Sequence, residues 1–217
     1  MLRTRVKICG ITRIQDVQAA CDAGVDAIGL VFYPKSSRVV SLEQARSLRK
    51  AVPAFVSVTA LFVNVPAEQV RQVLEQVRPD VLQFHGDETP EYCTSFDHPY
   101  MKAFRVGGPG LEEPHSVLQA CRRHAHAAAW LFDSYSPGYG GSGLTFDIGL
   151  LDEVRRARDS RPMVLAGGLN PQNVGDAIRA VRPYALDVSS GVEESGGIKS
   201  PEKIRAFMQS VYQVSAS

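Results

Sequence analysis

The chain has 217 residues, of which 44% are hydrophobic and 22% charged, so it can form a sizeable core and does not have the composition of a disordered protein. Its 24 Lys and Arg against 23 Asp and Glu give a net charge of +1, which provides no basic surface for nucleic acid or an anionic membrane. No apolar run reaches the roughly 18 residues of a membrane span. The basic N-terminal segment lacks the apolar stretch of a signal peptide, so we expect a cytoplasmic protein.

The cysteines and histidines give no sign of a metal site. The four cysteines are far apart in the sequence and form no CxxC pair, which favours free thiols over a disulfide framework or a cysteine-rich zinc site. The sequence has no HExxH motif and no cluster of carboxylates at ligand spacing, so we expect no metal. His124 and His126, near the end of a predicted helix, are interpreted as surface residues.

Apolar strands alternate with amphipathic helices along the chain. We expect strands at Arg5–Cys9, Ala27–Phe32, Phe55–Val63, Val81–His85, Tyr100–Arg105, Ala129–Asp133, Met163–Ala166 and Ala185–Ser189. Helix starts are predicted from four capping patterns, which are Thr12 with Gln15, Ser41 with Gln44, Asn170-Pro171 and Ser200-Pro201. The other helices are expected at Glu68–Val77, Glu91–Phe96, Leu111–His124 and Ile148–Arg158, and the glycine-rich segment Ser134–Gly143 is expected to be a loop.

This alternation predicts the fold class. Eight strands separated by helices pair in parallel, because each return to the same end of the sheet needs a crossover. In a chain of this length, the arrangement without an open edge is a (β/α)₈ TIM barrel, so we predict an α/β protein with one barrel domain over residues 1–217. A doubly wound open sheet is the alternative, but no GxGxxG motif follows the first strand.

The alternation of side chains along each strand places polar residues inside the barrel. Lys7 and Cys9, Gln83 and His85, Asp133, and Asp187 and Ser189 share the inner faces of the first, fourth, sixth and eighth strands. They converge at the carboxyl ends of these strands, which is where such barrels place their chemistry. A purely structural interior would have Val, Ile and Leu at these positions.

Each candidate also has a simpler interpretation. Cys9 is either a small buried hydrophobe or a thiolate assisted by Lys7 on the same face. Asp133 is either a turn residue or a buried carboxyl group with a chemical task. Arg38, in the loop after the second strand, is either solvated or directed to a ligand, and His85 and Asp187 are either satisfied core residues or ligand contacts.

Glycines follow the seventh and eighth strands. Gly167 and Gly168 end the seventh strand, and Ser189, Ser190 and Gly191 end the eighth. Small residues there allow backbone N–H groups to approach an anion, which is the usual phosphate site of barrel enzymes. Two such turns together indicate a phosphate site, although either one alone is a weak signal.

Several motifs together identify a family resemblance. KICGITR at 7–13, PKSSRVVS at 34–41, LQFHGDE at 82–88, LFDS at 131–134, GGSGLTFD at 140–147, LAGGLNPQNV at 165–174 and LDVSSGVEESGGIKSPEKI at 186–204 resemble phosphoribosylanthranilate isomerase of tryptophan biosynthesis. The resemblance covers nearly the whole chain. One departure is Ile148, where many members of the family have an aromatic residue.

The resemblance implies an Amadori rearrangement of N-(5′-phosphoribosyl)anthranilate to 1-(2-carboxyphenylamino)-1-deoxyribulose 5-phosphate, the step that follows anthranilate formation and phosphoribosylation. It implies Cys9 as general base, Asp133 as general acid and Arg38 as the contact for the anthranilate carboxylate. Lys7, His85 and Asp187 are expected to contact substrate, and the two glycine turns are expected to bind phosphate. The iminium intermediate is itself the electron sink, so neither a metal nor a cofactor is expected.

Three rival functions remain at this point. A pentose-phosphate epimerase needs paired Asp and metal-binding His at strand ends, and an indole-glycerol-phosphate synthase needs Lys and Glu as acid and base. A non-catalytic phosphate-ligand binder keeps the glycine turns but needs neither Cys9 nor Asp133. For partners we expect a small phosphosugar, no nucleic acid and no membrane, and a monomer without excluding a dimer.

Overall fold

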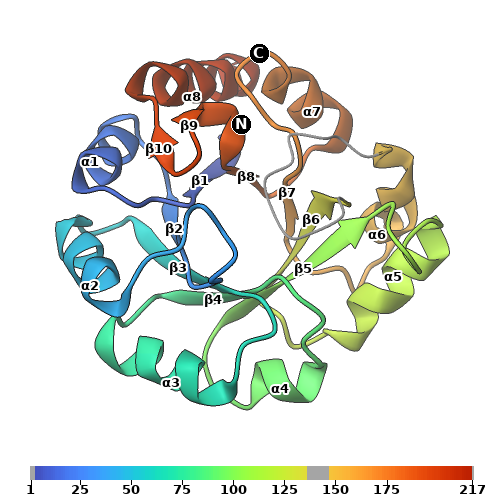
Figure 1. Ribbon diagram of the computed structural model, residues 1–217. Helices are drawn as coiled ribbons and strands as arrows, with labels where there is room; N and C mark the ends of the chain where they lie inside the picture. The colour runs from blue at the N-terminus through green and yellow to red at the C-terminus, as the bar shows by residue number, and fades with distance from the viewer. Residues whose placement is uncertain (1–2, 136–146, 217) are drawn as a thin grey trace.

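The computed structural model describes residues 3–135 and 147–216, and eight parallel strands in these ranges form a closed barrel (Figure 1). The ring closes because β8 pairs with β1, with Lys7 opposite Asp187. The strands are β1 (Arg5–Cys9), β2 (Ala27–Val31), β3 (Ser57–Phe62), β4 (Val81–Phe84), β5 (Tyr100–Val106), β6 (Ala129–Ser134), β7 (Met163–Leu165) and β8 (Ala185–Val188). The predicted fold class is therefore confirmed.

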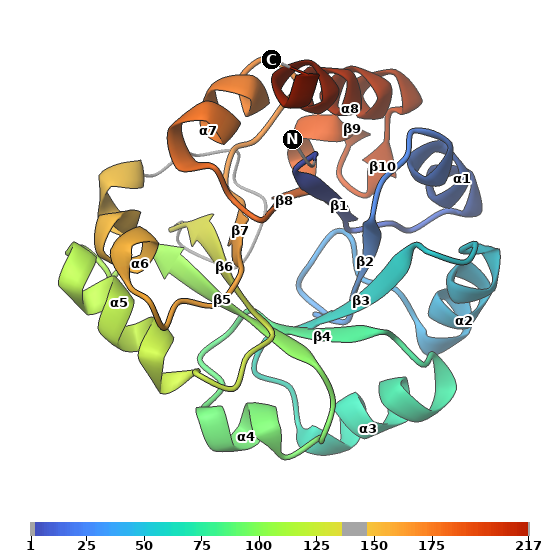
Figure 2. The ribbon, with the colours of Figure 1, turned by 180° about the vertical axis from the view of Figure 1, so that it is seen from behind.

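Helices surround the barrel, as both views show (Figures 1 and 2). They are α1 (Ile14–Asp22), α2 (Leu42–Ala51), α3 (Ala67–Gln76), α4 (Pro90–Thr94), α5 (Pro114–Arg123), α6 (Asp152–Arg156), α7 (Val174–Val181) and α8 (Pro201–Ala216). Two 3₁₀ turns, η1 (Ile148–Leu151) and η2 (Ser190–Val192), precede α6 and follow β8. Among the described residues, no helix is both long and apolar enough to cross a membrane.

The alternation along the strands separates two apolar layers. Val6, Ile8, Trp130 and Phe132 point outward and pack with the inner faces of the helices in the main core. A second, smaller cluster fills the barrel itself and contains Ala103, Ala129, Leu131, Val164 and Ala166. Because this cluster fills part of the interior, the polar residues occupy the remaining part, toward the carboxyl ends of the strands.

The segment after β8 contains a feature that the sequence did not predict. The strands β9 (Glu193–Ser195) and β10 (Ile198–Lys199) form a small antiparallel hairpin outside the barrel. Thr12, in the loop after β1, donates its hydroxyl hydrogen bond to the backbone oxygen of Gly197 in this hairpin. The hairpin is thus fixed to the β1 loop.

Two of the four predicted helix starts are confirmed. Ser41 accepts a hydrogen bond from the backbone N–H of Gln44, and Ser200 accepts one from Lys203. The Thr12 prediction is wrong, because Arg13 precedes α1 and the Thr12 hydroxyl bonds to the hairpin instead. The helix predicted directly after Asn170 begins only at Val174, because Asn170 first forms a turn by accepting from two backbone N–H groups.

Other differences lie at loops and helix ends. Phe55 was expected to begin the third strand, but it is fully exposed with φ of 70°, and the strand begins at Ser57. His126 is exposed as expected, whereas the prediction of a surface His124 is wrong. The ring of His124 lies against Phe104, and its backbone oxygen accepts from the Trp130 indole. Most of the predicted loop Ser134–Gly143 and of the GGSGLTFD motif lies outside the described residues.

Candidate active site

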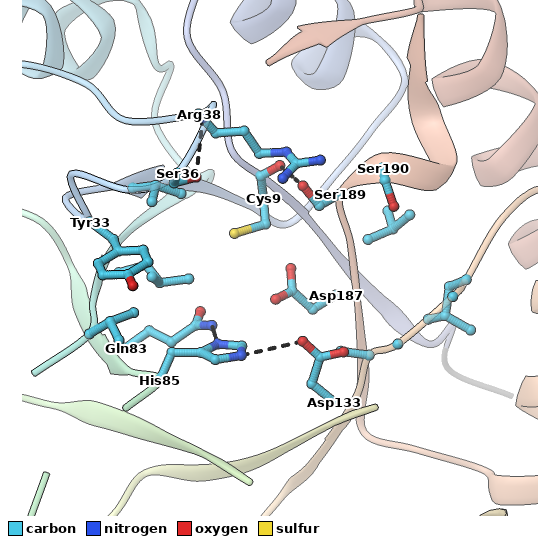
Figure 3. Close-up of a pocket in the computed structure, with 18 residues that line it drawn as sticks. Cys9, Tyr33, Ser36, Arg38, Gln83, His85, Asp133, Asp187, Ser189 and Ser190 are labelled. Carbon is cyan, nitrogen blue, oxygen red and sulfur yellow. Dashed lines mark hydrogen bonds and ion pairs between the residues drawn. The ribbon is translucent and has the colours of Figure 1, made fainter. Parts of the chain in front are cut away.

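One pocket opens at the carboxyl ends of the strands and collects most of the candidate residues (Figure 3). It encloses about 720 Å³ of space free of protein atoms, counting its open mouth. Nine of the predicted residues line it, namely Cys9, Arg38, His85, Asp133, Gly167, Gly168, Asp187, Ser189 and Ser190. Lys7 is buried below Cys9 on the same strand, and Gly191 lies behind the lining, against the backbone of Leu169.

Cys9 and Lys7 share the inner face of β1 with an acidic partner from β8. The Lys7 ammonium is 2.9 Å from both carboxylate oxygens of Asp187, and both side chains are almost entirely buried. Gly29 on the adjacent strand makes room for this group, because a Cβ there would lie 2.8 Å from the Cys9 sulfur and 3.1 Å from Lys7 Cε. The absence of a side chain at Gly29 therefore allows the thiol and the ammonium to lie together.

The pKa of the Cys9 thiol is raised, although the neighbouring Lys7 ammonium alone would lower it. Burial raises the pKa of the Cys9 thiol, and Asp187 raises it further, whereas Lys7 and Lys199 lower it. The net direction is upward. Lys7 does lower the pKa of Cys9, as expected, but burial has the larger effect and raises it. Cys9 is therefore mainly a thiol near neutral pH.

Asp133 enters the pocket from a different side, at the end of β6 (Figure 3). One of its oxygens accepts from the backbone N–H of Ser134 at 2.8 Å, and the other is 3.3 Å from Nε2 of His85. The amide nitrogen of Gln83 is 3.1 Å from Nδ1 of His85. When this amide donates, Nδ1 is an acceptor and the ring proton is on Nε2, facing Asp133.

Arg38 extends from the loop after β2 over the pocket. Its Nε and Nη2 groups donate to the two carboxylate oxygens of Glu193 at 2.8 and 2.7 Å. This hydrogen-bonded pair raises the pKa of Arg38. The loop arginine is therefore not simply solvated but is held in one orientation.

The two glycine turns lie side by side at the pocket. Gly167 and Gly168 have φ of 81° and 62°, which are values that favour glycine. A Cβ at Gly191 would lie 1.9 Å from the backbone oxygen of Leu169, so the turn after β8 packs directly on the turn after β7. The structure therefore brings together the two turns that the sequence assigned to phosphate.

Sequence reasoning missed some residues of the site. Gln83 was recognised as facing inward but was given no role, and Tyr33 and Ser36 of the pocket lining were not singled out. Glu193 and Lys199 lie within a quoted motif, but nothing in their spacing indicated that they lie near Arg38. Among the described residues, no group of three His, Cys, Asp or Glu side chains is placed to hold a metal.

Comparisons with known proteins agree on one family. The family model for N-(5′-phosphoribosyl)anthranilate (PRA) isomerase matches residues 6–210. The isomerase of that name from Bordetella avium is 57% identical, covering 98% of this chain and 97% of the relative, and the one from Pseudomonas syringae pv. tomato is 50% identical, covering 98% and 99%.

Solved structures give the same result. The phosphoribosyl anthranilate isomerase of Thermotoga maritima superposes with a TM-score of 0.87 at 39% identity, covering 97% of this chain and 99% of that one. A phosphoribosyl anthranilate isomerase in complex with reduced 1-(o-carboxyphenylamino)-1-deoxyribulose 5-phosphate superposes with a TM-score of 0.83 at 36% identity, with the same coverage. The chain belongs to the N-(5′-phosphoribosyl)anthranilate isomerase family.

Proposed function

We propose that this chain catalyses the Amadori rearrangement of N-(5′-phosphoribosyl)anthranilate to 1-(2-carboxyphenylamino)-1-deoxyribulose 5-phosphate in tryptophan biosynthesis. The observation that carries this proposal is that Cys9 and Asp133 line one pocket from different strands, with Arg38 and the two glycine turns on the same rim. The family membership supports the choice of substrate. Neither the epimerase nor the synthase alternative accounts for this set of residues.

The pocket offers a separate contact for each part of the substrate. Backbone groups of Gly167, Gly168, Ser189, Ser190 and Gly191 bind the phosphate, and the Arg38 guanidinium binds the carboxylate of the aromatic ring. The ribose then lies between these ends, within reach of His85 and Asp187. Held at both ends, the sugar presents its ring oxygen and C2′ to the acid and the base.

Ring opening needs an acid. Asp133 donates a proton to the furanose ring oxygen while the bond from that oxygen to C1′ breaks, and the nitrogen lone pair forms the iminium. The imidazole of His85 lies beside this carboxyl group, with Nε2 3.3 Å from one of its oxygens. The electrons of the breaking bond stay on the oxygen, which becomes a hydroxyl group.

The second step needs a base. The Cys9 thiolate removes the C2′ proton, and the electrons of that bond move into the iminium to give an enolamine. Loss of the enol proton and protonation at C1′ then give the ketone, so substrate and product remain isomers. The Lys7 ammonium stabilises the thiolate as it forms. The iminium accepts the electrons, so these steps use no metal and no cofactor.

A fluorescence assay that follows the loss of phosphoribosylanthranilate tests this function directly. The purified chain should consume the compound, and a coupled synthase should convert the product onward. A non-catalytic phosphate binder would bind the compound without consuming it. In that outcome, the fold and the phosphate turns would stand, and the roles of Cys9 and Asp133 would be wrong.

A further inference from the structure

Arg38 is one member of a buried cluster of three charged side chains. Glu193 accepts two hydrogen bonds from Arg38 through its two oxygens, and the Lys199 ammonium is 2.7 Å from one of them, Oε1. The exposed fraction of the side chain is 14% for Arg38, 5% for Glu193 and 0% for Lys199. Lys199 also donates to the backbone oxygen of Ser189, so the cluster reaches the rim of the pocket.

The charges in this cluster do not cancel. Burial lowers the pKa of Lys199, and Glu193, 2.7 Å away, opposes this shift. With Lys199 protonated, two cations and one carboxylate leave one positive charge in a largely buried place. Burial raises the pKa of Glu193, but Arg38 and Lys199 outweigh it and lower the pKa overall, so Glu193 remains a carboxylate at neutral pH. A buried charge without a partner is costly, which favours an anion as the missing partner.

The geometry also leaves one side of the guanidinium available. An arginine has five N–H donors, arranged so that a carboxylate can pair with the Nε/Nη2 side or with the Nη1/Nη2 end. Glu193 occupies the first of these. Among the described residues, no acidic side chain is paired with the second, and Arg38 is one of the residues that line the pocket. Gly10 permits this position, because a Cβ on it would lie 2.4 Å from Arg38 Cδ.

We infer that Glu193 and Lys199 are positioning residues for recognition of the substrate carboxylate. Glu193 fixes the guanidinium so that its free end faces the pocket, and Lys199 neutralises Glu193 so that the charge of Arg38 is left for the substrate. This inference rests on the proposed function, because it assumes that Arg38 meets the carboxylate of the aromatic ring. It predicts that the β9–β10 hairpin determines selectivity for substrates with that carboxylate.

The hairpin is fixed well enough for this task. Lys203 at the start of α8 donates to the backbone oxygen of Glu193 at 2.6 Å, and Thr12 bonds to the backbone of Gly197. A Cβ at Gly197 would lie 3.0 Å from the backbone oxygen of Ser37, next to Arg38, so hairpin and loop are in close contact. Glu193 therefore acts on Arg38 from a supported position.

Two variants separate orientation from charge. Glu193→Leu/Lys199→Met removes a carboxylate and an ammonium together, so the site keeps its single positive charge while Arg38 loses its support. Lys199→Met keeps the Arg38–Glu193 pair but cancels the net charge. Glu194→Gln is the matched control, because Glu194 is the exposed neighbour on the same hairpin. Removing one partner from a buried ion pair destabilises a protein, so thermal unfolding of each variant checks that it is folded at the temperature of the binding measurement.

The measurement is calorimetric binding of two compounds. One is reduced 1-(o-carboxyphenylamino)-1-deoxyribulose 5-phosphate, and the other is its phenylamino counterpart without the carboxylate. Each of the two variants should weaken binding of the first compound at least about fivefold, because a charge-assisted contact is weakened. Binding of the second compound should change less than about twofold. Glu194→Gln should change neither.

The outcomes distinguish this inference from the proposed function. If the unmodified chain neither binds the carboxylate compound nor turns over phosphoribosylanthranilate, the proposed function fails. If it does both, but the variants weaken binding of both compounds equally or of neither, the function stands and the inference is overturned. A Lys199→Met variant that shifts the pH profile of turnover without weakening binding would also overturn it, because the excess charge would then serve Cys9.

Discussion

The two sides of the pocket differ in the charged groups beside the reacting residue, and the difference matches the two proton transfers proposed for them. On the Cys9 wall, formed by Lys7, Cys9 and Asp187, a buried ammonium lies beside the thiol. On the Asp133 wall, formed by Gln83, His85 and Asp133, the described contacts of the carboxyl group are a backbone N–H and an imidazole, without Lys or Arg. A thiol that must lose its proton to act as a base benefits from a nearby cation, whereas a carboxyl group that must keep its proton to act as an acid does not.

The strongest test of this comparison removes the reacting group from each wall. Cys9→Ser and Asp133→Asn should each lower kcat by about 100-fold or more, which is the typical contribution of a positioned acid or base. Binding of the reduced product analogue should persist in both, because neither substitution removes the phosphate or carboxylate contacts. A well-folded Cys9→Ser enzyme with near-normal kcat would show that Cys9 is only a packing residue.

A smaller effect is expected from Arg38→Lys. Lysine keeps the charge but cannot hold Glu193 with two parallel hydrogen bonds and a substrate carboxylate with two more. The loss should be roughly 1.5–3 kcal/mol, seen as a higher KM with a smaller change in kcat. Steady-state kinetics with phosphoribosylanthranilate measure it. An unchanged KM would remove Arg38 from substrate recognition.

Gly168→Val tests the phosphate turn that lies between the two walls. The φ of 62° at this position is strained for a branched residue. KM should rise about tenfold or more because the proposed phosphate contacts are charge-assisted hydrogen bonds, while circular dichroism should show an intact barrel. Inorganic phosphate should inhibit the unmodified chain competitively and lose that effect in the variant. If KM stays the same, phosphate binds elsewhere.

The pH dependence of kcat/KM tests how the Lys7–Asp187 ion pair affects the pKa of Cys9. Activity requires the thiolate and the protonated acid together. A carboxyl group ordinarily titrates well below a thiol. Between the two pKa values the thiolate fraction rises as the protonated-acid fraction falls, so kcat/KM stays level. Above the pKa of Cys9 the thiolate fraction no longer rises, and kcat/KM should fall. Lys7 lowers that pKa and Asp187 raises it. The alkaline limb should therefore move to higher pH in Lys7→Gln and to lower pH in Asp187→Asn.

Each unit of increase in the thiol pKa lowers the thiolate fraction at neutral pH about tenfold, so Lys7→Gln should also lose activity at pH 7. The two substitutions must shift the limb in opposite directions. A shift in the same direction, or none, would mean that the alkaline limb does not report Cys9.

Much of this site could be predicted from the sequence, because it follows from the alternation of side chains along strands. Lys7 and Cys9 are two residues apart, as are Gln83 and His85, so each pair shares a face, and parallel strands bring their ends together. The turn glycines are recognisable for a similar reason, since they lie in the turns that follow two strands.

The contacts of the hairpin have no such local signal. Arg38 and Glu193 are 155 residues apart, and the hairpin strands have three and two residues, too few for a periodic pattern. His124 was assigned wrongly for a related reason. Its position at a helix end favours exposure, but the indole of Trp130 and the ring of Phe104, which belong to other elements, enclose it.

His124 gives the last prediction, which concerns a residue outside both walls. Burial and the nearby cations Lys102 and Arg123 together lower the pKa of His124 to about 4, with burial the largest cause. The unfolded chain binds a proton near pH 6.5 and the folded chain only near pH 4, so the free energy of unfolding falls as the pH falls between these values. The loss at pH 4.5 relative to pH 7 should be roughly 2–3 kcal/mol.

Urea unfolding at pH 7 and pH 4.5 measures this effect. His124→Gln should be less sensitive to acid than the unmodified chain by about that amount, because glutamine does not titrate, and its kcat at pH 7.5 should be unchanged. His126→Gln is the matched control, since His126 is exposed two residues away and should leave the pH dependence of stability as it was. If both variants respond to acid like the unmodified chain, the buried His124 does not make the fold acid-sensitive. If kcat falls in His124→Gln, the chemistry is not confined to the two walls of the pocket.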